Sequence, residues 1–150
     1  LIEDVIDEQA DKFKQRRQGI SFKHKKRNVI VAVDPERMRM VFENLIDNAS
    51  KYSPQGKNDT VELRQTKDKI IVSVTDQGVG IAKKDISQLF RKFTRLENEL
   101  STLVGGTGLG LYWVKKMVAL HQGEITVESK IHKGTVFTIT IPRNYDEKRT

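Results

Sequence analysis

The sequence predicts an α+β fold, a two-layer α/β sandwich in which helices cover one face of a mixed, mostly antiparallel sheet. Three observations predict it: apolar residues recur at helical spacing after Pro35, alternating segments pair across short turns in both halves of the chain, and a second helical segment separates those pairs. The chain has 150 residues, of which 37% are hydrophobic and 31% charged. That is the size of one domain with enough apolar material for a core.

The N-terminal part contains one helix and two short extended runs. Residues 1–17 have helical spacing, and Gly19 is expected to end the helix. Residues 20–23 and 29–33 are rich in β-branched and aromatic side chains. Both runs are predicted to be short strands.

A strong helix start follows at Asp34 and Pro35, because an N-cap aspartate precedes a proline at the first helical position. The helix is expected to end at residues 53–56, where serine, proline and glycine interrupt it. Between these signals one face of the helix is apolar, and it consists of Met38, Val41, Phe42, Leu45, Ile46 and Ala49.

The middle of the chain predicts a hairpin and then a long loop. Residues 60–66 and 69–75 alternate as strands do and are separated by a two-residue turn. Residues 81–107 are polar and weakly periodic, with short helical turns expected around 84–87 and 88–93. Because long loops are uncommon in compact domains unless they act as lids, this loop is a candidate lid.

The C-terminal part predicts a helix and a second hairpin. The helix is expected at residues 108–120, with Gly123 closing it. Residues 124–130 and 135–141 alternate as strands around a turn. The charged tail after Pro142 completes the chain.

Three polar residues stand at helical spacing on one flank of the central helix: Asn44, Asn48 and Lys51. Asparagine is a poor helix former, so two asparagines on one flank of a helix suggest a functional role. Amide oxygens can ligate Mg²⁺, and the lysine can face phosphate as a point charge. A polar rim around a buried face explains the same stripe, and the two explanations stay open.

Asp76 follows directly on a predicted strand, and Gly78 and Gly80 come next. The glycines let the backbone bend sharply and let a flat ligand approach. A carboxylate at such a place can accept a hydrogen bond from an exocyclic amine such as the 6-amino group of adenine. A surface turn gives the same pattern and remains the alternative.

A glycine-rich run leads straight into the next predicted helix. Unpaired N–H groups and the helix dipole at such a start suit a phosphate group. A flexible hinge is the alternative, although the run is richer in glycine than one hinge needs. Its residues are Gly105, Gly106, Thr107, Gly108, Leu109 and Gly110.

In order and spacing, four segments resemble the sequence boxes of histidine kinases. Residues 43–54 resemble the N box, 76–81 the G1 box, 89–95 the F box and 106–111 the G2 box. The resemblance covers residues 20–142 and implies the catalytic, ATP-binding domain of a sensor histidine kinase. This family belongs to the Bergerat-fold, or GHKL, ATPases, so the resemblance also implies the Bergerat ATP-binding fold.

The resemblance implies a role for each matching position. Asn44 and Asn48 match the Mg²⁺ ligands, Lys51 and Tyr52 match positions near the phosphates, and Asp76 matches the carboxylate that meets the adenine amine. Asn44, Asn48, Lys51 and the lid residue Arg95 form the implied catalytic set. Phe90 and Phe93 resemble the aromatics that pack the lid against the body. Gly78, Gly80, Ile81, Gly106, Thr107, Gly108, Leu109 and Gly110 complete the implied nucleotide-binding set.

The implied function is to bind Mg·ATP and transfer its γ-phosphoryl group to a histidine on a separate dimerisation hairpin. None of the three histidines is followed by an acidic residue, as the family's phosphoacceptor is. The resemblance therefore implies that residues 1–19 are a helical link from a hairpin outside this sequence, that 20–142 are the catalytic domain and that 143–150 are a tail. Gyrase-type relatives place a water-activating glutamate at the position of Asn44, so transfer to histidine is favoured over hydrolysis.

The implied partners are ATP, the phosphoacceptor hairpin of the same protein and a response regulator, in a parent that is a homodimer. The chain has no cysteine and no membrane-spanning run, so we expect a cytoplasmic domain, with membrane contact only through other parts of an inner-membrane sensor. Two other functions stay open: a nucleotide-binding regulatory module without chemistry, and a nucleic-acid binder. The net charge of +7 suggests the latter, but the basic residues are not gathered in one place, so no nucleic acid is expected as a partner.

Overall fold

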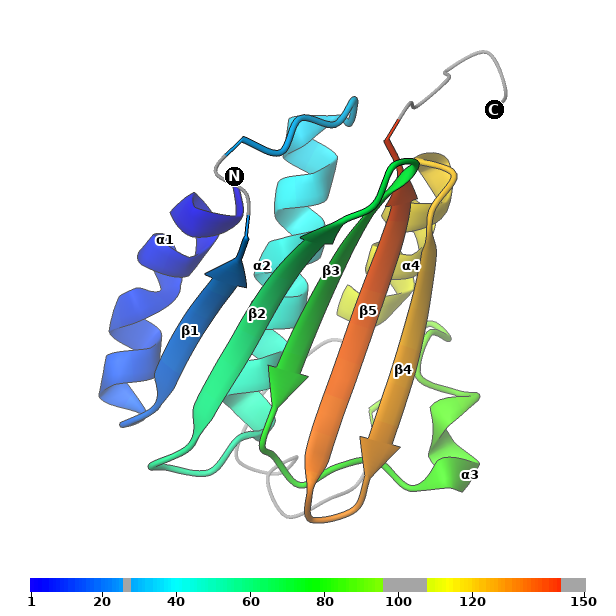
Figure 1. Ribbon diagram of the computed structural model, residues 1–150. Coiled ribbons are helices and arrows are strands. Elements are labelled where there is room, and N and C mark those ends of the chain that lie inside the picture. Colours follow the sequence, from blue (N-terminus) through cyan, green and yellow to red (C-terminus); the bar gives the residue numbers. More distant parts are fainter. Residues whose placement is uncertain (26–27, 96–107, 144–150) are drawn as a thin grey trace.

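A computed structural model describes residues 1–25, 28–95 and 108–143. It has two layers, with helices packed on one face of a five-stranded sheet (Figure 1). The predicted fold class is therefore confirmed. In chain order the elements are α1 (Ile2–Gln15), β1 (Gly19–His24), α2 (Pro35–Tyr52), β2 (Asn58–Gln65), β3 (Lys69–Asp76), α3 (Lys83–Ile86), α4 (Gly110–Leu120), β4 (Glu124–Lys130) and β5 (Gly134–Pro142).

The sheet has the strand order β1-β2-β3-β5-β4. β1 and β2 are parallel, and the other neighbouring pairs are antiparallel. A parallel pair needs a crossover connection, and α2 supplies it between β1 and β2. β3 and β5 lie side by side at the centre, with Asp76 opposite Thr135 at one end and Lys69 opposite Pro142 at the other. Leu1 and the end of β5 lie at the end of the sheet away from Asp76 (Figure 1).

The core lies between the sheet and α2. The apolar face of α2 that the sequence predicted is buried, and it packs with the inward-facing residues of the sheet. α1 and α4 flank α2 on either side (Figure 1). The buried apolar side chains of the sheet are Val61, Ile70, Val72, Val74, Phe137, Ile139 and Ile141.

The ends of α2 are fixed by side chains. At its start the Asp34 carboxylate accepts hydrogen bonds from the backbone N–H groups of Glu36 and Arg37, at 3.0 and 3.1 Å. The Asp34 N–H donates to Nε2 of the buried His121 at 3.0 Å, and the His121 Nδ1–H faces the Met117 carbonyl at 2.7 Å. His121 therefore joins the end of α4 to the start of α2.

α1 belongs to the same packed body as the sheet. Ile2, Val5 and Phe13 are buried in the shared core, and the Gln9 side chain donates to the Glu43 carbonyl of α2 at 3.1 Å. Beyond the helix, the Gln18 amide donates to the carbonyl oxygens of residues 50 and 53 at the end of α2. The origin of α1 as a link from a hairpin stays a prediction, but the helix is packed and not freely extended.

Two local predictions were wrong. Residues 29–33 alternate between half-buried and exposed side chains, yet they form no strand, because no strand edge in the described part of the chain pairs with them. α1 ends at Gln15, Arg17 just beyond its C-cap has a left-handed φ of 53°, and Gly19 is already the first residue of β1. Alternation alone therefore did not identify a strand, and an arginine took the place expected for a helix-ending glycine.

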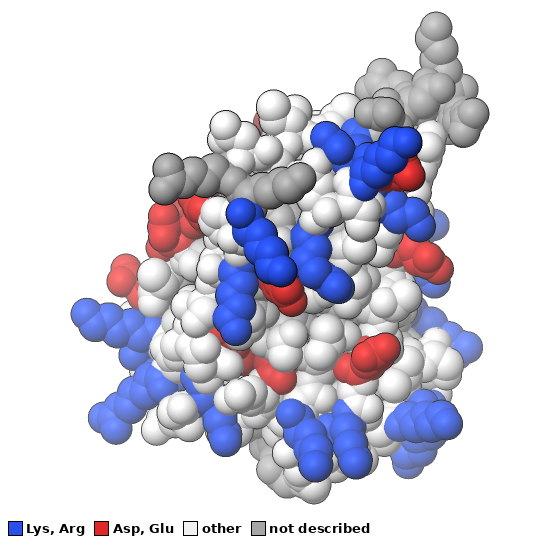
Figure 2. Space-filling view, viewed as in Figure 1, with Lys and Arg blue, Asp and Glu red and all other residues white. Residues whose placement is uncertain are grey.

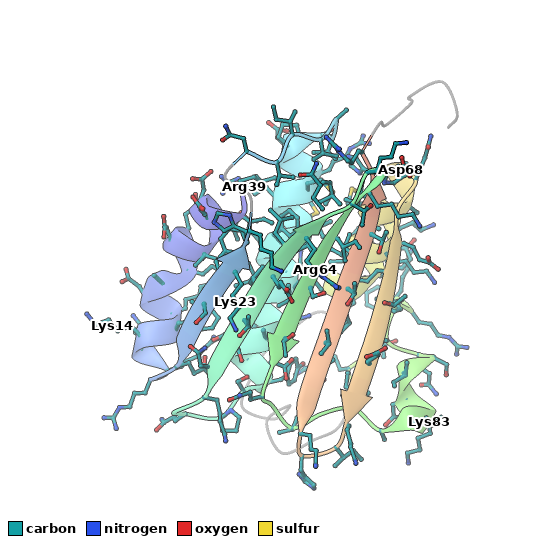
Figure 3. All side chains as sticks on the ribbon, in the orientation of Figure 1. Lys14, Lys23, Arg39, Arg64, Asp68 and Lys83 are labelled. Atoms are coloured by element: carbon teal, nitrogen blue, oxygen red, sulfur yellow. The ribbon has the colours of Figure 1, made fainter. Side chains whose placement is uncertain are left out.

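Basic side chains are spread over the molecule. On the face seen in Figure 2, Lys and Arg lie mostly around the rim and are interspersed with acidic residues. Lys14, Lys23, Arg64 and Lys83 come from four different elements; Lys23 and Arg64 lie on the paired strands β1 and β2, whereas Lys14 and Lys83 lie on opposite sides of the molecule (Figure 3). Among the described residues, no helix is both long and apolar enough to cross a bilayer.

Replacing the deeply buried Phe13 of α1 tests whether this helix is part of the cooperative unit. Phe13 is 2% exposed, so Phe13→Ala should lower the free energy of unfolding by about 3–5 kcal/mol in urea denaturation followed by circular dichroism. Phe93→Ala is the matched control, because this phenylalanine is 71% exposed and its loss should change stability by less than about 0.5 kcal/mol. Equal effects of the two variants would contradict the packing of α1 in the core.

Candidate functional site

A cavity of about 180 Å³ lies between α2, the Asp76 end of β3 and the start of α4. Residues far apart in the sequence meet there, because α2 and α4 pack side by side on the sheet. Among the residues that the sequence singled out, the cavity is lined by Asn44, Asn48, Lys51, Tyr52, Asp76, Gly80, Ile81, Arg95, Gly108 and Gly110.

Two other predicted residues that the structure describes do not line this cavity. Gly78 lies behind Asp76 and donates its N–H to that carboxylate, and Leu109 is the N-cap residue of α4. Gly106 and Thr107 lie outside the described residues, as do the last twelve positions of the candidate lid, 96–107.

The polar stripe of α2 directs one amide oxygen toward the start of α4. The Asn44 Nδ2 donates to the Met40 carbonyl one turn earlier, at 2.8 Å, so the amide oxygen is left for other partners. That oxygen points at the first residue of α4, since a Cβ added to Gly110 would lie 2.6 Å from it. Glu43 turns away from the cavity and lies 3.7 Å from Arg39.

Lys51 is paired with a residue that the sequence analysis did not select. Its Nζ lies 2.9 Å from Oδ2 of Asp47, one helical turn earlier, and Asp47 also lines the cavity. Lys12 of α1 stands 3.8 Å from the other oxygen of Asp47. The i, i+4 spacing of an acid and a lysine could have identified the pair from the sequence.

Asp76 is buried with its carboxylate at the edge of the cavity. Its Oδ1 accepts hydrogen bonds from the backbone N–H groups of Gly78 and Thr135, at 2.9 and 3.2 Å, which leaves Oδ2 as the acceptor for a ligand. Burial, together with the charge of Asp59, raises the pKa of Asp76 to about 6 against the opposing effect of the two backbone hydrogen bonds.

Asp59 is a second buried carboxylate, beside Asp76, and sequence reasoning missed it. It is fully buried, and its Oδ1 accepts a hydrogen bond from the Ser53 hydroxyl at 2.8 Å. Burial raises the pKa of Asp59 to about 6, although the Ser53 and Gln77 hydrogen bonds oppose this. The strand was predicted to begin at Thr60, so the aspartate one residue earlier was not recognised as facing inward.

The loop after Asp76 is held close to the end of α2. The Val79 N–H donates to the Tyr52 carbonyl at 3.1 Å, and a side chain on Gly78 would collide with that same carbonyl. On the other side the Ile81 N–H donates to the Ser129 hydroxyl at 2.8 Å. Residues 77–81, which we call the adenine loop after their predicted role, are thus held against both the end of α2 and β4.

The two F-box phenylalanines lie in different environments. Phe90 packs edge-to-face against Phe137 of β5, with ring centroids 6.4 Å apart and an interplanar angle of 81°. The prediction that Phe93 also packs inward was wrong. Its backbone is left-handed, with φ of 61°, and its side chain is 71% exposed. The neighbouring Leu89, which was not selected, is buried and lines the cavity.

Comparison with known families identifies one that covers most of the chain. Residues 33–145 match the family described as histidine kinase-, DNA gyrase B- and HSP90-like ATPases. The matched region begins just before α2 and extends past β5, so it contains every described residue that lines the cavity.

Individual relatives are sensor histidine kinases. The chain is 37% identical over 124 residues to the sensor histidine kinase WalK of Bacillus subtilis, covering 81% of this chain and 20% of that protein. It is 42% identical over 103 residues to the sensor-like histidine kinase SenX3 of Mycolicibacterium smegmatis, covering 69% of this chain and 27% of that protein. The chain therefore spans only a fifth to about a quarter of the length of these two relatives.

Solved structures show the same fold. The catalytic domain of the histidine kinase ThkA superposes with a TM-score of 0.83 at 25% identity, covering 95% of this chain and 92% of that one. Full-length ShkA in complex with AMPPNP superposes with a TM-score of 0.82, covering 94% of this chain and 29% of that one. At 22% identity the second comparison supports the fold alone.

The buried Asp59 predicts an unusual dependence of stability on pH. The pKa of this carboxyl is about 6 in the folded protein and 3.8 ordinarily, so between about pH 4 and 6 the folded state binds more protons than the unfolded state. The contribution of Asp59 to stability therefore falls as pH rises through this range, and the full loss persists above it.

Asparagine at this position does not titrate but still accepts a hydrogen bond from Ser53. Asp59→Asn should thus raise the free energy of unfolding by about 1–3 kcal/mol at pH 7.5, and the gain should vanish near pH 4 in urea titrations. A gain of the same size at both pH values would contradict the assignment.

Proposed function

Because this chain belongs to the family of histidine kinase-, DNA gyrase B- and HSP90-like ATPases, we propose that it binds Mg·ATP and transfers the γ-phosphoryl group to a histidine on another domain. The observation that carries the proposal is the single cavity that brings the Asn44, Asn48 and Lys51 stripe together with Asp76. One end of the cavity suits an adenine amine and the other suits phosphate with a divalent cation. A ligand that carries both a base and phosphates would meet both ends, whereas a free base or a free phosphate would meet only one of them.

Asp76 would recognise the base. A carboxylate accepts but does not donate, so its free oxygen prefers an exocyclic amine to a carbonyl. At C6 of the purine ring, adenine carries an amine and guanine carries a carbonyl. Ile81, Leu89 and Phe137 give the cavity apolar walls suited to a flat ring.

Asn44 and Asn48 would hold Mg²⁺ through their amide oxygens. When bound, the ion neutralises charge on the phosphates and helps to orient the γ-phosphoryl group. The residues fit this task, since the Asn44 amide nitrogen is already bonded to its own helix and its oxygen is left for other partners. Lys51 would exchange its contact with Asp47 for phosphate, and Arg95, which lines the cavity from the lid side, would add positive charge.

The acceptor supplies its own nucleophile. An imidazole nitrogen forms the P–N bond while the bond from the γ-phosphorus to the β–γ bridging oxygen breaks, and ADP leaves. We assign no general base in this chain, because Glu43 faces Arg39 outside the cavity and Asp47, which lines the cavity, is paired with Lys51. A phosphoacceptor hairpin in the same protein, a response regulator and a homodimeric parent complete the proposal.

Asp76→Asn tests the adenine end of the cavity. The amide would present N–H donors to the donor amine of adenine, so the affinity for Mg·ATP should fall by about 100-fold in isothermal titration calorimetry. Asp68→Asn is the matched control, because Asp68 lies in the turn at the other end of β3 (Figure 3) and should leave the affinity unchanged. Unchanged ATP affinity of Asp76→Asn would refute the adenine assignment.

Asn48→Ala tests the metal end and the transfer itself. Removing one amide oxygen should weaken Mg²⁺-dependent ATP affinity and reduce transfer by at least about 100-fold. Transfer is measured with labelled ATP and a separately made phosphoacceptor hairpin of a histidine kinase. Asn58→Ala, on the exposed start of β2, should transfer like the wild type. Tight ATP binding by the wild type without any transfer would favour a regulatory nucleotide-binding module.

A further inference from the structure

A second carboxylate stands behind the adenine site. In the antiparallel register Thr60 pairs with Thr75, so the next residues outward, Asp59 and Asp76, lie opposite each other. Side chains directly opposite on one face of a sheet are close neighbours. Both side chains are buried, and Asp59 itself does not line the cavity.

Asp59 also joins two parts of the site. It accepts a hydrogen bond from the hydroxyl of Ser53, the C-cap residue of α2, at 2.8 Å, and another from the backbone N–H of Gln77 in the adenine loop. One side chain therefore links the end of the helix that carries the stripe to the loop that carries the base contact.

The charge of Asp59 needs an explanation beyond these hydrogen bonds. Its Oδ2 is buried and has no hydrogen-bond partner among the described residues. A buried carboxylate with an unsatisfied oxygen costs stability, and asparagine would accept the same bonds without the charge. The charged group that faces it is Asp76.

We propose that Asp59 is a positioning residue of the adenine site, which ties the adenine loop to the end of α2 and whose charge makes nucleotide affinity depend on pH near neutrality. The inference rests on the proposed binding of adenine nucleotides. It assigns Asp59 no contact with the nucleotide and no part in the chemistry.

The surroundings of the pair favour this coupling. From β1 the register partner of Asp59 is the apolar Ile20, and from α2 it is approached by the neutral Ser53. The cations that line the cavity with Asp76 are Lys51, which is paired with Asp47, and Arg95. Repulsion from Asp59 raises the pKa of Asp76, and an adenine amine needs Asp76 ionised. Nucleotide affinity should therefore be lost as pH falls through about 6.

The test measures Mg·ATP affinity between pH 5 and 7.5 by calorimetry in the wild type, Asp59→Asn and Asp59→Ala. The wild type should lose about tenfold in affinity over this range. Asp59→Asn keeps the acceptor but not the charge, so it should bind within about twofold of the wild type at pH 7.5 and lose clearly less at pH 5. Asp59→Ala leaves the Ser53 hydroxyl and the Gln77 N–H without an acceptor and should bind about tenfold more weakly at pH 7.5.

Two further variants separate positioning from folding. Val61→Ala removes a buried side chain two residues along β2 and should weaken the fold while keeping the wild-type pH profile. Ser53→Ala removes one of the two hydrogen bonds that Asp59 accepts and leaves Asp59 in place. It should weaken Mg·ATP binding at pH 7.5 by about threefold. This variant replaces Asp59→Ala in the test if Asp59→Ala does not fold.

The outcomes distinguish this inference from the function on which it rests. An Asp59→Asn profile identical to the wild type would overturn the effect of the charge. Wild-type affinity at pH 7.5 in folded Asp59→Ala, or in Ser53→Ala where the first does not fold, would overturn the positioning role. Failure of the wild type to bind Mg·ATP, or equal binding by Asp76→Asn, would instead overturn the proposed function.

Discussion

The whole site depends on how α2 lies on the sheet. The helix buries Val41, Leu45 and Ile46 against the strands, and this fixes its rotation about its own axis. Because the rotation of the helix is fixed, its polar flank can face in only one direction. Asn44, Asn48 and Lys51 must face the end of β3, where Asp76 stands. The hydrophobic contact that stabilises the domain is therefore also what aligns its polar groups.

The sheet contributes a second constraint, because β3 and β5 end together at the cavity. Their pairing brings the Thr135 N–H to the Asp76 carboxylate and so holds that side chain in one orientation. The same burial makes ionisation costly, which is why Asp59 and Asp76 both have a raised pKa. Precise placement of a carboxylate and ease of its protonation thus have one physical origin.

Much of the fold and of the site could be predicted from the sequence because it follows from the regular spacing of side chains along a helix or a strand. Helical spacing placed the asparagine stripe on one flank of α2, and the break after a regular strand located Asp76 at a strand end. Properties that depend on distant partners could not be predicted. Residues 29–33 alternate like a strand but have no edge to pair with, Phe93 is turned outward by its own backbone, and Asp59 becomes notable only once β2 is paired with β3.

Leu1 and the end of β5 lie together at the end of the sheet far from Asp76 (Figure 1). A polypeptide attached at either of these points would begin at the end of the sheet opposite the Asp76 cavity. The arrangement suits a module that can be placed in the middle of a longer chain or at its end, because neither position changes which side meets an incoming partner. The cavity itself therefore sets no requirement on the position of such a module along a chain.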